Sequence, residues 1–181
     1  MIALDTVPIG PHAPDEINLV VTQPAGSAPL AVEVDPLSGL ATVARLYQSA
    51  MISPGTFGLI PQTRSERGQP LAAFLPVDAS LPAGLAIACR PVGVVYVTSA
   101  EADVVTVLAV PLGRVTARFD KVRSYTDIGA PALRQLSHYL THAQDLEDDQ
   151  LPRSAAWGDV SEAHRVIEEA MRRARPGVTN A

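Results

Sequence analysis

The stretch that decides the fold is Arg64-Ser65-Glu66-Arg67-Gly68-Gln69-Pro70-Leu71-Ala72-Ala73-Phe74-Leu75-Pro76. A polar turn around Gly68 leads into an apolar run that predicts a buried strand over residues 71–75, closed by Pro76. Gly68 gives the backbone the freedom that a turn needs, and Pro70 fixes its own φ. We therefore expect a rigid corner that presents positions 67, 69 and 72.

Upstream of this corner the sequence predicts three short strands, at residues 17–22, 30–34 and 40–46. The turn residues between the last two, Asp35 to Gly39, include a proline and a glycine and predict a hairpin. Residues 1–16 are rich in proline and predict an irregular lead-in, whereas residues 53–58 predict a loop that leads to the corner.

Downstream the pattern changes from strands to helices. A long strand is predicted over residues 85–99, with Pro91 and Gly93 indicating a bulge or barrel corner, and residues 103–111 predict its partner. One helix is predicted over residues 131–146 from an apolar stripe of Leu133, Leu136, Leu140, Ala143 and Leu146. A second begins at a capping box of Asp159 and Glu162, with its buried face at Ala163, Val166, Ile167, Ala170 and Met171.

The composition predicts one domain over residues 1–181, with a disordered tail at residues 176–181. A chain of 181 residues that is 47% hydrophobic is long enough for a real core. A net charge of −5 without a basic run excludes nucleic acid as a partner. No leader and no apolar run of membrane length is found, so we expect a soluble, cytoplasmic protein without membrane contact. Cys89, the single cysteine, stands in an apolar run and predicts a buried thiol.

The corner resembles the signature of the soluble family I inorganic pyrophosphatases, D-G-D-P-x-D followed by two apolar residues. Further matching pieces are Val32 to Asp35, Cys89 to Val94, and Asp145 to Glu147, so that the resemblance spans residues 7–175. It implies an α+β fold, a small OB-like five-stranded β-barrel with two C-terminal helices packed beside it, often assembled as a hexamer. The glycine and proline of the signature remain, but its aspartate positions hold Arg67, Gln69 and Ala72.

The resemblance also places the family's functional positions on this chain. Two of them keep their residue type, Glu33 and Arg45, which we interpret as a catalytic acid–base and electrostatic pair; a cross-strand salt bridge is the alternative. The other positions hold mostly small, uncharged side chains, which we predict to line a substrate pocket: Thr22, Ala31, Ser53, Phe57, Gln69, Ala72, Ser99, Val104, Thr106, Ala143 and Gln144.

These replacements lead to a hypothesis about function. Mg²⁺ needs several oxygen ligands, so we expect no metal and no cofactor, and reject pyrophosphate hydrolysis. We interpret the chain as a repurposed protein that binds a neutral, mostly apolar small molecule at the barrel mouth. There it would catalyse a metal-independent cyclisation or rearrangement in specialised metabolism. The alternatives are a non-catalytic pseudoenzyme with an assembly or regulatory role, and a Mg²⁺-dependent inorganic pyrophosphatase.

One helix face predicts the oligomeric contact. His138, His142 and Asp145 recur at helical spacing, which is also a spacing of metal ligands. No further ligands accompany them, and the resemblance implies that histidines at this point of the helix contact another subunit. We therefore expect a homo-oligomer, a hexamer or a smaller piece of one, formed through this face.

Overall fold

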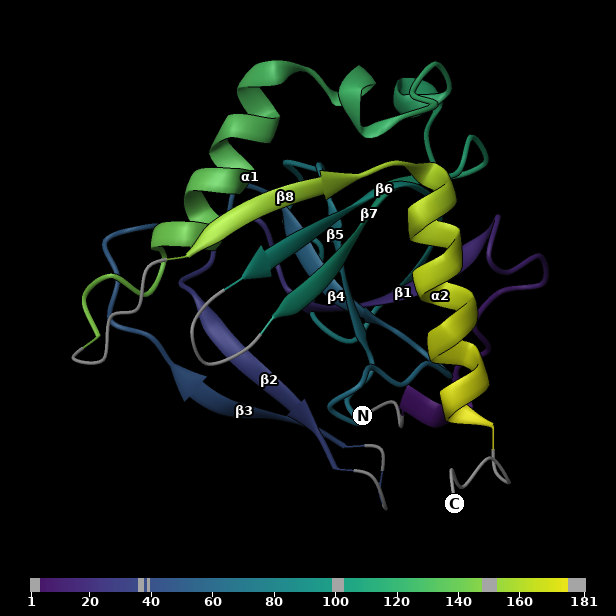
Figure 1. The fold of residues 1–181 in the computed structure, drawn as a ribbon, viewed down its shortest axis with the longest axis horizontal. Coiled ribbons are helices and arrows are strands. Elements are labelled where there is room, and N and C mark those ends of the chain that lie inside the picture. Colours follow the sequence, from purple (N-terminus) through teal and green to yellow (C-terminus); the bar gives the residue numbers. More distant parts are fainter. Residues whose placement is uncertain (1–3, 36–37, 39, 99–102, 148–152, 176–181) are drawn as a thin grey trace.

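The computed structural model describes residues 4–35, 38, 40–98, 103–147 and 153–175. Its centre is a barrel of five strands: β1 (Ile17–Gln23), β4 (Thr56–Ile60), β5 (Leu71–Leu75), β7 (Val104–Pro111) and β6 (Ala86–Thr98). They pair in this order, and β6 pairs back with β1, so the hydrogen bonds close the ring (Figure 1). The pairing of β5 with β7 is parallel and the others are antiparallel. The predicted OB-like five-stranded barrel is thus confirmed.

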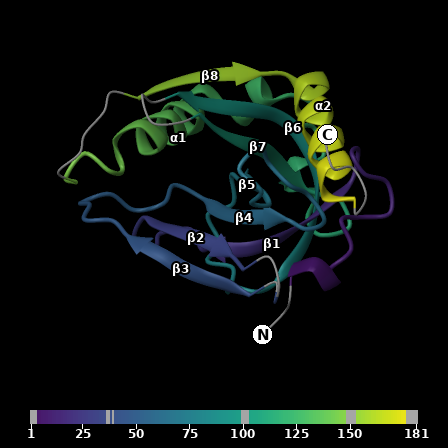
Figure 2. The ribbon, with the colours of Figure 1, turned by 60° about the horizontal axis from the view of Figure 1, so that its bottom comes forward.

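Other elements surround this barrel. Strand β8 (Ser154–Gly158) pairs with β6, and the hairpin of β2 (Leu30–Val34) and β3 (Ala41–Leu46) forms a separate two-stranded sheet. Figure 2 shows β8 and the helices α1 (Ala130–His142) and α2 (Val160–Ala174) on one side of the molecule, with the hairpin on the opposite side. Three short 3₁₀ helices cover Leu4–Thr6, Ala117–Phe119 and Tyr125–Ile128.

The two helices cover the barrel through apolar side chains, as predicted. In α2 the buried residues are Ala163, Val166, Ile167 and Ala170, and Met171 packs against the same cluster. The helix begins as expected at Asp159, whose Oδ1 accepts a hydrogen bond from the Glu162 amide at 2.9 Å. In α1, Leu136 packs into a second cluster that includes Phe74 and Leu108. Burial of these faces holds both helices against the sheet.

The corner at Gly68 is a tight turn. Gly68 has a φ of 76°, a conformation that side chains other than glycine adopt only at a cost. Its amide donates to the Ser65 carbonyl at 3.0 Å, and the Ser65 amide donates to the Gln69 carbonyl at 2.7 Å. Pro70 is buried at the entrance to β5. The rigid corner predicted from the sequence is therefore confirmed.

Three local predictions need correction. Residues 53–58 are not wholly a loop, because β4 begins at Thr56. Gly58 allows β4 to lie close to β1, since a Cβ at this position would lie 2.4 Å from the Val20 carbonyl oxygen. Strand β8 was not predicted. Helix α1 ends at His142, so Leu146 leaves the apolar stripe and is 62% exposed. The bulge is confirmed, with a register shift between Pro91 and Gly93.

Burial also decides the state of the single cysteine. The Cys89 side chain is fully buried in the barrel core, and burial raises the pKa of its thiol to about 12. The predicted tail at residues 176–181 lies outside the described residues. Within the described part of the chain, none of the helices has both the length and the apolar character needed to span a membrane.

Candidate functional site

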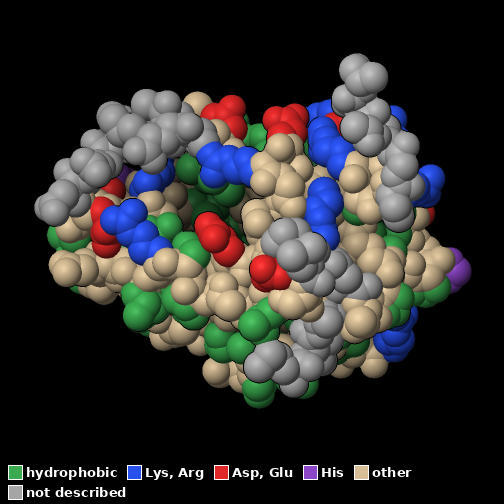
Figure 3. Space-filling model, turned by 90° about the horizontal axis from the view of Figure 1, so that it is seen from below, with side chains coloured by type: hydrophobic (Ala, Val, Ile, Leu, Met, Phe, Trp, Pro, Cys, Tyr) green, Lys and Arg blue, Asp and Glu red, His purple; other side chains and the backbone are tan. Residues whose placement is uncertain are grey.

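A pocket of about 220 Å³ opens at one end of the barrel, which we call the mouth. Figure 3 shows the molecule hollowed on one face, with hydrophobic side chains in the hollow and charged ones around it. The lining comes from β1, β2, β4, β5, β7, α1, the segment before β2 and the segments that follow β3 and α1. It consists of Thr22, Gln23, Pro29, Leu30, Val32, Tyr47, Phe57, Gly58, Leu59, Ala72, Val104, Thr106, Tyr139, Leu140, Ala143 and Gln144. No side chain in this lining is charged.

The structure brings most of the predicted substrate-pocket residues together. Ala72 of β5 and Thr106 of β7 are partners in the parallel register, which places their side chains together on one wall. Along with them, the lining contains Thr22, Phe57, Val104, Ala143 and Gln144. These positions come from four strands and from the segment after α1, far apart in sequence, so the barrel topology assembles the pocket.

The remaining predicted positions lie elsewhere. Ser53 is buried, and its hydroxyl donates to the Gly55 carbonyl at 2.7 Å. Ala31 lies in the hairpin opposite Arg45 and does not line the pocket. Ser99 falls outside the described residues.

Gln69 links the corner to the hairpin instead of facing the pocket. Its Oε1 accepts from the Val34 amide at 2.9 Å, and its Nε2 donates to the Val34 carbonyl at 3.4 Å. The side chain therefore completes the backbone hydrogen bonding of β2 in the way that a neighbouring strand would.

The two predicted catalytic residues are not paired with each other. Both lie exposed on the hairpin, where Glu33 stands opposite Thr42 and a bulge after Ala31 shifts the register. Among the ion pairs of the described residues, Arg45 pairs with Glu147 through Nη2 and Oε2. The cross-strand salt bridge considered as the alternative is therefore wrong, and the charge of Arg45 stays at the rim of the mouth.

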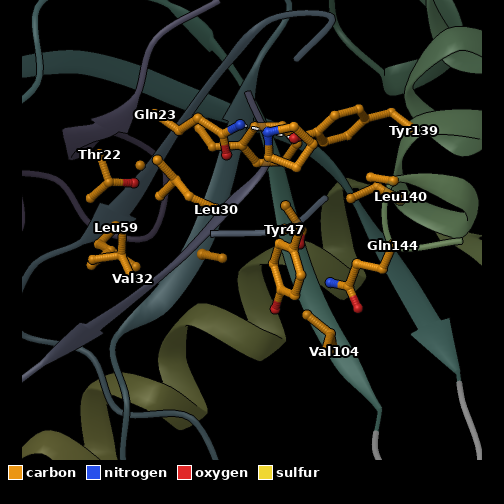
Figure 4. A pocket seen from close by; sticks show the side chains of 16 residues that line it. Thr22, Gln23, Leu30, Val32, Tyr47, Leu59, Val104, Tyr139, Leu140 and Gln144 are labelled. Carbon is orange, nitrogen blue, oxygen red and sulfur yellow. Dashed lines mark hydrogen bonds between the residues drawn. The ribbon is translucent and has the colours of Figure 1, made fainter. Parts of the chain in front are cut away.

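Sequence reasoning missed several lining residues, among them three with polar groups: Gln23, Tyr47 and Tyr139. Figure 4 shows Gln23 and Tyr139 joined by a hydrogen bond, with Tyr47 apart from them in the cavity, beside Gln144 and Val104. Gln23 Nε2 donates to the Tyr139 hydroxyl at 2.9 Å, and burial raises the pKa of Tyr139. The Tyr139 ring also lies 5.7 Å from that of Phe57. Tyr139 follows Leu136 by three residues, a spacing that indicates the buried face of α1.

The lining offers hydrogen bonds but no full set of metal ligands. Its polar groups are hydroxyls and amides set among apolar walls. In the part of the chain that the structure describes, no three side chains of His, Cys, Asp or Glu lie close enough to hold a metal ion. Mg²⁺ takes several oxygen ligands in near-octahedral geometry. The described residues thus do not fit the metal site that the resemblance implies.

Comparisons with known proteins agree with the fold. A family model described as inorganic pyrophosphatase matches residues 19–175. An inorganic pyrophosphatase of Agrobacterium fabrum is 35% identical over 170 residues, which are 94% of this chain and 96% of that protein. One of Haemophilus ducreyi is 34% identical over 172 residues, 95% of this chain and 98% of its own. The solved structure of an inorganic pyrophosphatase from Coxiella burnetii superposes with a TM-score of 0.84 at 25% identity, covering 93% of this chain and 100% of that one.

These similarities correct the functional interpretation drawn from the sequence. Relatives that match nearly the whole chain at this identity are all named for one reaction. The interpretation as a metal-independent cyclase or binder of a neutral molecule in specialised metabolism is therefore wrong, as is the pseudoenzyme alternative. The reaction that the missing aspartates led us to reject is the one that the comparisons favour.

Proposed function

Because the chain belongs to the inorganic pyrophosphatase family, we propose that it hydrolyses inorganic pyrophosphate at the mouth of its barrel. The observation that supports this proposal is the similarity in sequence and fold along nearly the entire chain. The matched region contains the strands of the barrel, apart from the first two residues of β1, and both helices that pack against it. The proposal includes a cytoplasmic location, with which a single buried cysteine agrees.

Only a few of the described residues have side chains suited to a role in pyrophosphate hydrolysis. Arg45 is a permanently charged, 60% exposed group at the rim, and its planar guanidinium suits the oxygens of a phosphate. Thr22 and Gln144 offer hydrogen bonds inside the pocket. The lining itself carries no charge to offset a polyanion, and burying an uncompensated charge is costly. We therefore expect the substrate to be held near the rim.

Metal ions would supply the attacking hydroxide in this chemistry, but the described carboxylates do not fit them, and we derive no step through a metal. What these residues do is hold the anion, orient it and exclude part of the solvent. For this reason we expect turnover below the range of ~1–10³ s⁻¹ that is typical of enzymes.

Phosphate release from pyrophosphate tests the proposal, measured both with Mg²⁺ and with a chelator. We expect release above the enzyme-free blank, and a loss of roughly tenfold in kcat/KM for Arg45→Met, because the exposed cation is the rim contact for the anion. Arg118→Met is a matched control. Arg118 is 59% exposed, pairs with Asp78, lies 5.3 Å from the Phe119 ring, and does not line the mouth. Release no faster than the blank in both conditions would overturn the proposal.

We also propose that the His138, His142 and Asp145 face of α1 joins subunits of a hexamer. Both imidazoles are exposed, their ring centres lie 4.6 Å apart, and His142 Nδ1 lies 2.7 Å from Asp145 Oδ2. The neighbouring Leu136 faces the barrel, so this side of the helix is available to another subunit.

A further inference from the structure

Glu147 fastens the segment after α1 to β3 and to the segment that follows it. Its Oε2 pairs with Arg45 Nη2, and its Oε1 accepts a hydrogen bond from the Gln48 amide at 2.8 Å. The Glu147 side chain is only 17% exposed, whereas that of Arg45 is 60% exposed. About a hundred residues separate the partners in sequence, so the fold creates this contact.

The surroundings of this carboxylate are those of an anion-binding position. One guanidinium and one main-chain N–H converge on its two oxygens, the donors that proteins commonly use for phosphate oxygens. The Gln48 amide and then Arg45 hold the pKa of Glu147 below its usual range, since both favour the charged form. The position is thus built for an anion and is filled by a side chain of the chain itself.

We infer that Glu147 is an internal competitor for the anion that binds at the mouth. A phosphate oxygen that reaches Arg45 has to displace the Glu147 carboxylate from the guanidinium and from the Gln48 amide. This inference rests on the proposed function for the identity of the anion, a phosphate or pyrophosphate. The displacement forms and breaks only hydrogen bonds and an ion pair.

Tyr47 connects this exchange to the pocket. In sequence, Tyr47 lies between Arg45 and Gln48. Its side chain lines the cavity, and its ring centre lies 5.5 Å from the Arg45 guanidinium carbon. In Figure 4 its side chain lies beside Gln144 and Val104. Release of Glu147 therefore removes one attachment of the segment that carries Tyr47, while the Tyr47 amide still donates to the Pro29 carbonyl at 3.2 Å.

Binding measured by calorimetry in a chelator at low salt tests the inference, with inorganic phosphate and with pyrophosphate as probes. Glu147→Gln keeps the size of the side chain but removes its charge, and we expect it to lower Kd about two- to fivefold, the effect of one exposed ion pair. Asp103→Asn is the matched control. It removes one negative charge beside Val104 of the pocket lining, but Asp103 is not the partner of Arg45.

Each outcome decides the matter. A lower Kd in Glu147→Gln and an unchanged Kd in Asp103→Asn support competition at Arg45. An equal fall in Kd in both variants would indicate a general effect of net charge and would overturn the inference. An unchanged Kd in Glu147→Gln, or no binding by any of the proteins, would also overturn it. Because binding is measured without turnover, the two proposals can fail separately. The protein could release no phosphate from pyrophosphate and still show competition by Glu147, or it could release phosphate and show no competition.

Discussion

The β2–β3 hairpin and the barrel wall under α2 have similar strand sequences but very different burial. All six residues of β3 are exposed, and Val43 and Leu46 are 58% and 70% exposed. In the barrel wall, Leu19 is fully buried, as is Ile167 of the helix above it. Apolar packing holds the wall, whereas the hairpin packs on the barrel mainly through Val34 of β2, and polar contacts from Gln69 and Glu147 add to its attachment. The candidate site therefore uses the less tightly packed region of the molecule.

The largest expected effect is a loss of packing in the wall. Ile167→Ala should lower the free energy of unfolding by about 2–5 kcal/mol, because it leaves a cavity between α2 and the barrel. Val43→Ala in the hairpin should change it by less than about 0.5 kcal/mol, since that side chain is mostly in solvent. Urea unfolding measures both values. Similar losses in the two variants would contradict the contrast between these regions.

A smaller effect is expected where α2 meets β6. The Tyr96 hydroxyl donates to Glu162 Oε1 at 2.5 Å, and Arg165 donates to the same carboxylate at 2.6 Å. Tyr96→Phe removes a partly buried hydrogen bond and should lower the free energy of unfolding by about 1 kcal/mol at neutral pH, measured by urea unfolding. The change should be confined to stability, with the pocket unaltered.

The same contact predicts the direction of the pH dependence. Arg165 and then Tyr96 lower the pKa of Glu162 from 4.5 to about 2, so this contribution to stability is complete above pH 4.5 and is lost as the pH falls toward 2. Burial and then Glu162 raise the pKa of Tyr96 from 10.0 to about 12, so its contribution is lost as the pH rises through that interval. Unfolding free energies of Glu162→Gln that show the wild-type loss between pH 4.5 and 2 would exclude Glu162 as the source.

A local effect is expected at the corner. Gln69→Ala removes both hydrogen bonds to Val34 and should speed hydrogen exchange of the Val34 amide about fivefold, equivalent to about 1 kcal/mol, while amides of β1 stay protected. Gln135→Ala, on the exposed face of α1, is the control. Unchanged exchange at Val34 would mean that other contacts fasten the hairpin.

The smallest effect per residue is expected at the proposed subunit contact. Replacing His138 and His142 by alanine should raise the dissociation constant of the assembly by no more than about fivefold per residue, because most interface side chains contribute less than about 1 kcal/mol. Light scattering across a dilution series measures this, with His164→Ala on α2 as the control. A wild-type protein that scatters as a monomer at high concentration would end the proposal.

Prediction from sequence succeeded where neighbours in the chain decide the structure. The turn at Gly68, the cap at Asp159 and the buried face of α2 follow from local conformational preference and periodicity. Prediction failed at β4, because a glycine such as Gly58 indicates a loop when only the sequence is considered. The structure shows that Gly58 lies in a strand, packed against Leu19 and Val20 of β1. Prediction also missed Tyr47 and Gln23, since neither belongs to a local pattern that marks a pocket.

By itself, the sequence determined the corner, the barrel strands other than β4 and the two helices. These properties depend on backbone preference and on apolar spacing within a few residues. Only the tertiary structure decided that Gln69 binds the hairpin, that Arg45 pairs with Glu147 instead of Glu33, and that Gln23 meets Tyr139. Those partners lie 35, 102 and 116 residues apart, and a side chain's partner at such a distance depends on how the barrel closes.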